Sequence, residues 1–246
     1  MTRYGRRFVA QPLARSKKTI LAVGDLHCPF MHKDTTAFLR AIKNKHAFDE
    51  VVFLGDEIDG HALSQYKHDP DGLSAGHELD KAVEQLRDVY ELFPVAKICT
   101  SNHTMRPFRK ALDSGLPQRV LKELHDILEA PVGWKWADEW IIDGIVFEHG
   151  EGFTGALGAS RCAIANMRPT VIGHIHSHAG IMYAANKSSL WWGFNVGCLV
   201  DNSAYAFKYG RTMKYKPILG AGIIQEGVPR FIPMVLNGLG RWVGAL

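Results

Sequence analysis

Apolar residues in the first part of the chain form short runs that alternate with longer amphipathic segments. The runs at residues 19–24, 51–55 and 95–100 are rich in β-branched side chains and short enough to be buried strands. The segments at residues 34–46 and 79–93 repeat their apolar positions every three or four residues, as amphipathic helices do. The chain therefore begins in the order βαβαβ, which is typical of a sheet with parallel strands.

The rest of the chain is predicted to be mostly β-structure. Residues 140–147 suit a hairpin, because Asp143 and Gly144 can form its two-residue turn. Pro117 is expected to open a helix over residues 117–128, and a second helix is expected over residues 156–167. Further strands are expected at residues 170–172, 178–184, 190–196 and 218–228.

Composition narrows the class of protein. The chain of 246 residues is 46% hydrophobic and 22% charged, as expected of a globular protein rather than a disordered chain or a coiled coil. No apolar stretch approaches the length of a membrane span. Four widely spaced cysteines form no CxxC pair, so we expect a reduced, cytoplasmic protein. Residues 1–18 are predicted to be a basic arm and residues 19–246 a single domain. The net charge of +4 permits an anionic substrate without requiring one.

Polar clusters follow five of the apolar runs. The carboxyl ends of strands in an α/β sheet form a ligand-binding crevice, so these clusters are expected to converge. The clusters are Gly24-Asp25-Leu26-His27, Gly55-Asp56-Glu57-Ile58-Asp59, Ser101-Asn102-His103-Thr104, Glu148-His149-Gly150 and Gly173-His174-Ile175-His176. A single Gly-Asp at a strand end is usually a turn, but five such clusters in succession indicate a metal site.

The side chains of these clusters mix oxygen and nitrogen donors and contain no thiolate. Asp25 and His27 are two residues apart, as are His174 and His176, so each pair can face one ion as the chain leaves its strand. This donor mixture suits Mn²⁺, Fe or Zn²⁺ better than Ca²⁺ or a structural zinc site. Seven ligands are too many for one ion and suit two ions if one carboxylate bridges them.

The ordered motifs DxH, GDxxD, NH, HG and GHxH resemble those of the calcineurin-like metallophosphoesterase superfamily, and in particular its bacterial and bacteriophage phosphoesterases. The resemblance implies an α/β fold in the form of a four-layer α/β/β/α sandwich, in which helices flank two β-sheets. It also implies a dinuclear metal centre above the strand ends.

The resemblance assigns a role to each matching residue. Its metal ligands would be Asp25, His27 and His176 for the first ion, Asn102, His149 and His174 for the second, and Asp56 as the bridge. His103 matches the family's catalytic histidine. Asp59 matches the second acid of GDxxD, which in several branches of the family hydrogen-bonds that histidine.

The chain departs from the family pattern in two places. The third motif is usually Gly-Asn-His followed by Asp or Glu, but here Ser101 replaces the glycine and Thr104 replaces the acid. The support of this loop is therefore in question. Gly60 stands where protein Ser/Thr phosphatases carry an arginine, which counts against a protein phosphatase.

These features predict a dinuclear metal-dependent phosphoester hydrolase, and first of all a phosphodiesterase or nuclease. In this prediction a metal-bridging hydroxide attacks phosphorus in line while His103 assists the leaving group. The expected cofactors are two divalent ions, with Mn²⁺ first and Fe, Zn²⁺ or Ni²⁺ as alternatives. The expected partner is a phosphoester substrate such as a nucleic acid or nucleotide, without a membrane. The alternatives are a phosphomonoesterase and a metal-bound scaffold with weak catalysis.

Several residues near these motifs are secondary candidates for contact with a substrate. His61 and Tyr66 follow the second motif, His178 follows the last, and Arg106 and Arg109 follow the catalytic histidine. A solvated loop or ordinary packing is the alternative for each of them. Residues 205–216 interleave aromatic and cationic side chains that could stack bases and hold phosphates, although packing is the favoured interpretation.

Overall fold

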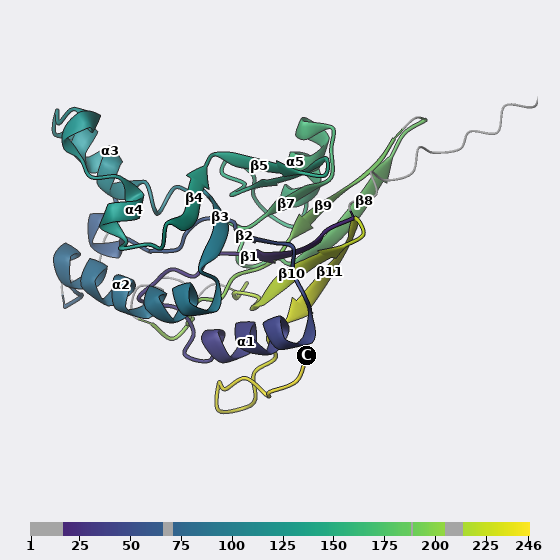
Figure 1. Ribbon diagram of the computed structural model, residues 1–246, viewed down its shortest axis with the longest axis horizontal. Helices are drawn as coiled ribbons and strands as arrows, with labels where there is room; N and C mark the ends of the chain where they lie inside the picture. The colour runs from purple at the N-terminus through teal and green to yellow at the C-terminus, as the bar shows by residue number, and fades with distance from the viewer. Residues whose placement is uncertain (1–16, 66–70, 188, 205–213) are drawn as a thin grey trace, which may run out of the picture.

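The first three predicted strands lie side by side within a six-stranded sheet in the computed structural model (Figure 1). The structure describes residues 17–65, 71–187, 189–204 and 214–246. The sheet has the order β11-β10-β1-β2-β3-β4. Strands β1 to β4 run parallel to one another, β10 runs antiparallel to β1, and β11 runs antiparallel to β10. Its strands are β1 (Thr19–Val23), β2 (Glu50–Phe53), β3 (Val95–Cys99), β4 (Gly133–Ala137), β10 (Gly220–Gln225) and β11 (Val228–Pro233).

A second sheet of five strands has the order β5-β6-β7-β9-β8. Strands β6, β7 and β9 are parallel, and β5 and β8 are antiparallel edges. The predicted hairpin joins β5 to β6, and its two turn residues, Asp143 and Gly144, both have positive φ, as a tight hairpin turn requires. The strands are β5 (Glu139–Ile142), β6 (Ile145–Glu148), β7 (Thr170–Ile172), β8 (Gly180–Ala185) and β9 (Leu190–Asn195).

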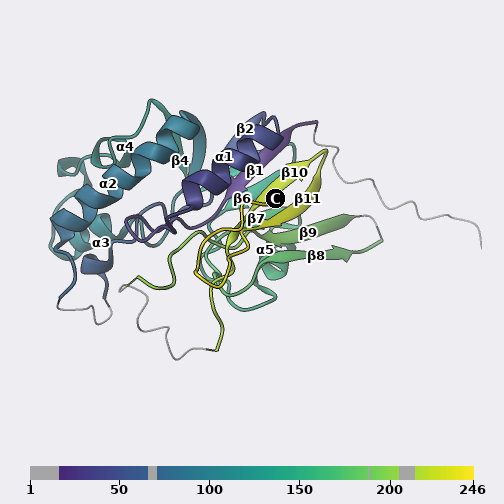
Figure 2. The same ribbon diagram turned by 90° about the horizontal axis from the view of Figure 1, so that it is seen from below.

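Helices cover the outer face of each sheet. Helices α1 (Thr35–Lys45) and α2 (Ala75–Leu92) lie alongside each other on the six-stranded sheet (Figures 1 and 2). Helix α5 (Gly158–Asn166) packs on β7 and β9 of the other sheet. In β1, Leu21 points toward the helices and Ile20 toward the second sheet, so apolar side chains fill both interfaces. This arrangement confirms the predicted α/β sandwich of two sheets flanked by helices.

The predicted helix over residues 117–128 is wrong. Only a 3₁₀ turn, η2 (Gln118–Val120), and one turn of α-helix, α4 (Leu124–Ile127), form there. Leu121 between them is extended, and Val120 is 60% exposed, so its apolar side chain has no surface to pack against. The longer helix in this part of the chain is α3 (Arg106–Asp113), which the apolar pattern did not predict because only Ala111 is buried in it.

Two other segments differ in detail from the prediction. The polar composition of residues 61–76 predicts a loop, and within this segment His61–Leu63 forms a 3₁₀ turn, η1. Strand β4 was not predicted, although Trp134 within it is fully enclosed and packs on Phe53 and Tyr90. Within the described residues, none of the helices has the length and apolar character needed to cross a membrane.

Candidate metal centre

The five polar clusters meet at the carboxyl ends of the strands, at the junction of the two sheets. Asp25, His27, Asp56 and His174 have φ values of 31°, 51°, 49° and 64°, in the left-handed region that disfavours side chains. Such strained positions cluster at functional sites, because surrounding contacts must hold them in place. Gly55, with φ 92°, is required beside Asp56, since an added Cβ would lie 2.5 Å from that of Ser101.

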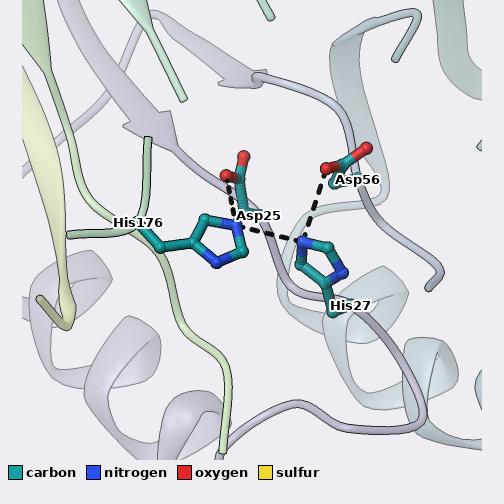
Figure 3. Close-up of side chains that lie close together, drawn as sticks. All are labelled: Asp25, His27, Asp56 and His176. Atoms are coloured by element: carbon teal, nitrogen blue, oxygen red, sulfur yellow. Dashed lines mark hydrogen bonds and ion pairs between the residues drawn. The ribbon is translucent and has the colours of Figure 1, made fainter. Parts of the chain in front are cut away.

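One group of converging donors consists of Asp25, His27, Asp56 and His176, as Figure 3 shows. The Nε2 of His176 lies 2.9 Å from the Oδ2 of Asp25 and 3.2 Å from the Nε2 of His27. The Nε2 of His27 lies 3.4 Å from the Oδ2 of Asp56. Three of these four side chains are buried; His176 is partly exposed.

A second group shares Asp56 and adds His149 and His174. The Nε2 of His149 lies 3.4 Å from the Oδ2 of Asp56 and 3.1 Å from the Nδ1 of His174. The Oδ1 of Asn102 lies 2.8 Å from the same Nε2. The structure therefore brings together all seven residues that the sequence proposes as ligands, in two groups joined at Asp56.

The donor atoms fit divalent cations. Ligand atoms held about 2.0–2.2 Å from one ion are themselves separated by roughly 3 Å, which is the spacing found within both groups. Both carboxylate oxygens of Asp25 are buried and accept no hydrogen bond among the described residues, although the Nε2 of His176 lies 2.9 Å from Oδ2. A buried carboxylate without donors is unfavourable, and a cation at this position would compensate it.

Outer contacts fix which nitrogen of two histidines faces the centre. The Nδ1 of His27 lies 2.6 Å from the Oδ1 of Asp59, and the Nδ1 of His149 lies 2.8 Å from the carbonyl oxygen of Leu54. Each Nδ1 can donate to these oxygens, so Nε2 is the nitrogen that faces the centre and would bind a metal ion once it has lost its proton. Metal-binding histidines are commonly oriented in this way. Asp59 thus contacts His27 as well as His103, a contact that the sequence did not predict.

The charges of the centre shift the pKa values of its members in opposite directions. Burial would lower the pKa of His27, but hydrogen bonds to Asp56 and Asp59 outweigh burial and raise it to about 10. Burial would raise the pKa of Asp56, but the neighbouring histidines, His149 first, hold it well below its usual range. Burial and the charge of His149 lower the pKa of His174. Asp56 is therefore ionised and His174 neutral at neutral pH, the forms in which both bind metals, whereas His27 carries a proton that a metal ion would displace.

His103 lies at the edge of the centre. Its Nδ1 lies 2.8 Å from the carbonyl oxygen of Asp59 and 3.2 Å from the Oδ1 of the same residue. Its Nε2 lies 3.1 Å from the guanidinium of Arg106, which also donates to the carbonyl oxygens of Asp59 and Gly60. The predicted contact between His103 and Asp59 is present, and Arg106 is placed beside both.

The centre opens into a cavity of about 400 Å³. Asp56, His103, His174 and His176 line one side of it, and Phe153 is among the residues that line the remainder. A ligand in this cavity would contact the candidate metal ligands and His103 directly.

The secondary candidates for contact with a substrate lie in different surroundings. The ring of His178 contacts that of Tyr215, 5.5 Å away, and Tyr215 rather than His178 lines the cavity. The Nδ1 of His61 lies 3.8 Å from the Oδ2 of Asp59. Tyr66 and residues 205–213 lie outside the described residues.

A model of the family of calcineurin-like phosphoesterases matches residues 18–178, a span that contains every motif of the centre. The chain belongs to the calcineurin-like phosphoesterase family. Members of this family use divalent metals, and the two donor groups are potential sites for such ions. No curated protein matches the chain.

Solved structures with related folds share little sequence with the chain. A metallophosphoesterase from Sphaerobacter thermophilus is 14% identical, with 89% of each chain covered and a TM-score of 0.44. Yfce, a phosphoesterase from E. coli, is 15% identical, with 92% of this chain and 96% of that chain covered and a TM-score of 0.43. A mutant of Vps29 from Entamoeba histolytica is 12% identical, with 84% and 85% covered and a TM-score of 0.40. At these TM-scores the likenesses carry no argument about activity.

Proposed function

We propose that the protein is a metal-dependent phosphodiesterase that cleaves a nucleotide or nucleic-acid substrate. The observation that carries this proposal is the convergence of both donor groups and His103 on one cavity. A phosphoester in that cavity would lie against the metal ligands and the candidate proton donor together. Proximity of this kind is a large part of what an enzyme contributes to a reaction.

Two divalent ions would be held by the two donor groups. The first group would supply Asp25, His27 and His176, the second Asn102, His149 and His174, and Asp56 would serve both. When bound, such ions polarise a phosphoryl oxygen and lower the pKa of water, so that a nucleophile is available at neutral pH. The family uses divalent metals, and Mn²⁺ is the first choice for this donor mixture.

The protein's own residues would orient the substrate and move the proton. Asp59 holds the Nδ1 side of His103, which leaves the Nε2 side to protonate the leaving oxygen. The guanidinium of Arg106 lies 3.1 Å from that Nε2 and can only donate to it, so for Nε2 to carry the proton Arg106 would donate to a phosphoryl oxygen of the substrate instead. Asp56 also accepts a hydrogen bond from the backbone N–H of His103, at 3.1 Å, and so ties the proton donor to the metal ligands.

Two separate hollows next to the candidate ligands favour a diester over a monoester. The cavity of about 400 Å³ is lined by His174 and His176. A second hollow of about 200 Å³, called here the hollow beyond Asn102, is lined by Asn102 and by side chains of α3. A diester has a substituent on each side of its phosphorus atom, and the two hollows can take one each. A monoester would use only one of them.

The test is turnover of chromogenic esters by protein stripped of metal and reloaded with Mn²⁺. We expect bis-p-nitrophenyl phosphate, a diester, to be hydrolysed, and His103→Ala to lower its kcat by about 10²–10⁴-fold. His125→Ala, a change on the partly exposed helix α4, is the matched control and should leave kcat unchanged. Turnover of p-nitrophenyl phosphate alone would favour a phosphomonoesterase. No turnover of either ester with metal bound would favour a scaffold and overturn the enzymatic proposal.

A further inference from the structure

The hollow beyond Asn102 carries three cationic side chains from one face of α3. Arg106, Arg109 and Lys110 follow the i, i+3, i+4 spacing that places helical side chains together, and all three line the hollow. Arg109 donates a hydrogen bond to the backbone oxygen of Asn102, so the cluster begins directly beside a candidate metal ligand.

Charge in the hollow is positive overall. Two acids, Asp113 and Glu151, also line it, against the three cations. Glu151 is more than half exposed, and its Oε1 lies 4.0 Å from the Nη1 of Arg109, which makes the pair a weak one. Guanidinium groups match phosphate oxygens in geometry and charge.

We infer that this hollow is a subsite for a second phosphate of the substrate, next to the phosphate that is cleaved. The inference rests on the proposed function and narrows its substrate class. The substrate would be a chain with consecutive phosphates, such as an oligonucleotide, rather than an isolated diester. Charge-assisted hydrogen bonds to such a phosphate are expected to favour it by about tenfold or more.

The test compares thymidine dinucleotides that differ only in terminal phosphates. We expect the internal diester of the dinucleotide phosphorylated at both ends to be cleaved with a kcat/KM about tenfold above that of the unphosphorylated dinucleotide. Arg109→Ala or Lys110→Ala should bring this ratio close to one. Lys81→Ala, an exposed change on α2 outside the hollow, should preserve the ratio.

The outcomes separate the subsite from the proposed function. Equal kcat/KM values for the two dinucleotides, both being cleaved, would overturn the subsite and leave the phosphodiesterase standing. If neither dinucleotide nor the chromogenic diester is cleaved, the proposed function fails. Calorimetry then tests the subsite separately: thymidine 3′,5′-bisphosphate should bind about tenfold tighter than thymidine 5′-monophosphate, and equal affinities would contradict the subsite.

A second inference comes from the two departures in the third motif. The hydroxyl of Thr104 donates to the Oε2 of Glu57 at 2.7 Å, and the hydroxyl of Ser101 donates to that of Thr104 at 3.0 Å. The backbone N–H of Asp56 in turn donates to the Ser101 oxygen at 2.7 Å. The indole of Trp136 donates to the other carboxylate oxygen of Glu57 at 2.6 Å. Glu57, Ser101 and Thr104 are all buried.

These bonds join the loop after β2 to the loop after β3. Both replaced residues of the third motif, Ser101 and Thr104, take part in the chain of hydrogen bonds, and Glu57 ends it as the only carboxylate in it. We propose that Glu57 is a positioning residue. It supplies, from the neighbouring strand end, the carboxylate that the third motif lacks, and so holds Asn102 and His103 toward Asp56.

The test is a double-mutant cycle between Glu57 and Thr104. Thr104→Val keeps the shape of the side chain but removes its hydroxyl, and should weaken Mn²⁺ binding at the second group and lower kcat, each by about 10–100-fold. Thr104→Ser retains the hydroxyl and should preserve both. Since the hydrogen bond from Thr104 to Glu57 is the link that both changes remove, Glu57→Gln combined with Thr104→Val should cost no more than the larger single change.

Metal affinity, measured by calorimetry, is a readout separate from turnover. Wild-type affinity and kcat in a folded Thr104→Val protein would contradict the positioning role. Additive effects of the two changes would also contradict it, because independent residues have additive effects. If Glu57→Gln does not fold, the comparison of Thr104→Val with Thr104→Ser decides the matter without it.

Discussion

The two sheets contribute different chemistry to the candidate centre. The six-stranded sheet, through the loops after β1, β2 and β3, supplies carboxylates, an amide and two imidazoles. The five-stranded sheet, after β6 and β7, supplies imidazoles alone. The first set is Asp25, His27, Asp56, Asp59, Asn102 and His103, and the second is His149, His174 and His176.

The two sets also differ in exposure. The side chain of Asp25 is 0% exposed and that of Asp56 is 2% exposed, whereas that of His176 is 24% exposed, and both His174 and His176 line the cavity. The first sheet thus buries the negative charge that a cation would compensate, and the second adds nitrogen donors, of which His174 and His176 line the cavity while His149 is buried. We expect the first sheet to determine whether metal binds and the second to contribute less per residue.

Replacing the carboxylate shared by both groups should have the largest effect. In Asp56→Asn we expect both ions to be lost and turnover to fall by on the order of 10³-fold or more, beyond the roughly 10–100-fold cost of losing an outer hydrogen-bond partner. Metal content and kcat of the purified variant measure this. Asp88→Asn, an exposed change on α2, is the control. If Asp56→Asn retains two ions, the first sheet does not determine whether metal binds.

Replacing an imidazole of the second sheet should have a smaller effect. His174 belongs to one donor group only, so His174→Ala is expected to release one ion and retain the other. Elemental analysis after dialysis should give about half of the wild-type metal content. Complete loss of metal in this variant would show that the second sheet matters as much as the first.

Replacing Asp25 should have opposite effects on the stability of the metal-stripped protein and on metal binding. Its buried carboxylate accepts no hydrogen bond among the described residues, although the Nε2 of His176 lies 2.9 Å from it. We therefore expect removal of its charge by Asp25→Asn to stabilise metal-stripped protein by about 1 kcal/mol. The same change should abolish metal binding at the first group. Urea unfolding with and without Mn²⁺ measures both effects. A less stable metal-stripped variant would show that the fold already compensates this charge.

Asp34 is a buried carboxylate that the protein itself compensates. It stands at the N-cap position of α1, but its carboxylate oxygens accept hydrogen bonds from Arg241 and from the backbone N–H of Trp242 instead of capping the helix. Hydrogen bonds from Arg241 hold its pKa well below the usual range. Because Arg241 is half exposed, we expect Asp34→Asn to cost only about 0.5–1 kcal/mol of unfolding free energy at pH 7.

The pH dependence of that cost follows from the direction of the pKa shift. A depressed carboxyl pKa stabilises the fold above the ordinary pKa of Asp, and this contribution is lost as the pH falls toward the depressed value. Urea unfolding of wild type and Asp34→Asn should therefore converge on acidification below pH 4. A difference that stays constant from pH 7 to pH 3 would contradict the assignment. Metal should leave this difference unchanged, in contrast to that of Asp25→Asn.

The sequence predicted the parts of the molecule that depend on local pattern. Short β-branched runs identified β1, β2 and β3, and the polar residues directly after these strands, β6 and β7 identified the seven candidate ligands. It did not identify β4, whose Trp134 and Trp136 are separated from the other strands by irregular chain. It also placed one continuous helix over residues 117–128, where Val120 is exposed and the end of the segment, at Ile127 and Leu128, packs on the core.

The parts of the site that the sequence did not predict depend on contacts between segments that are distant in the chain. The bond between Thr104 and Glu57 spans 47 residues, and nothing in the spacing of either motif implies it. Arg106 reaches Gly60 and Asp59 across 46 and 47 residues. Such contacts follow from the packing of β2 against β3, which brings the loops after them together, and a linear pattern does not contain them.

The number of ions that bind per chain tests the central claim most directly. Titration of metal-stripped protein with Mn²⁺, followed by calorimetry, should give two equivalents for the wild type, because two donor groups share Asp56. A stoichiometry of two that falls to zero in Asp56→Asn would support a dinuclear centre that depends on the first sheet. One equivalent or none in folded wild-type protein would contradict it.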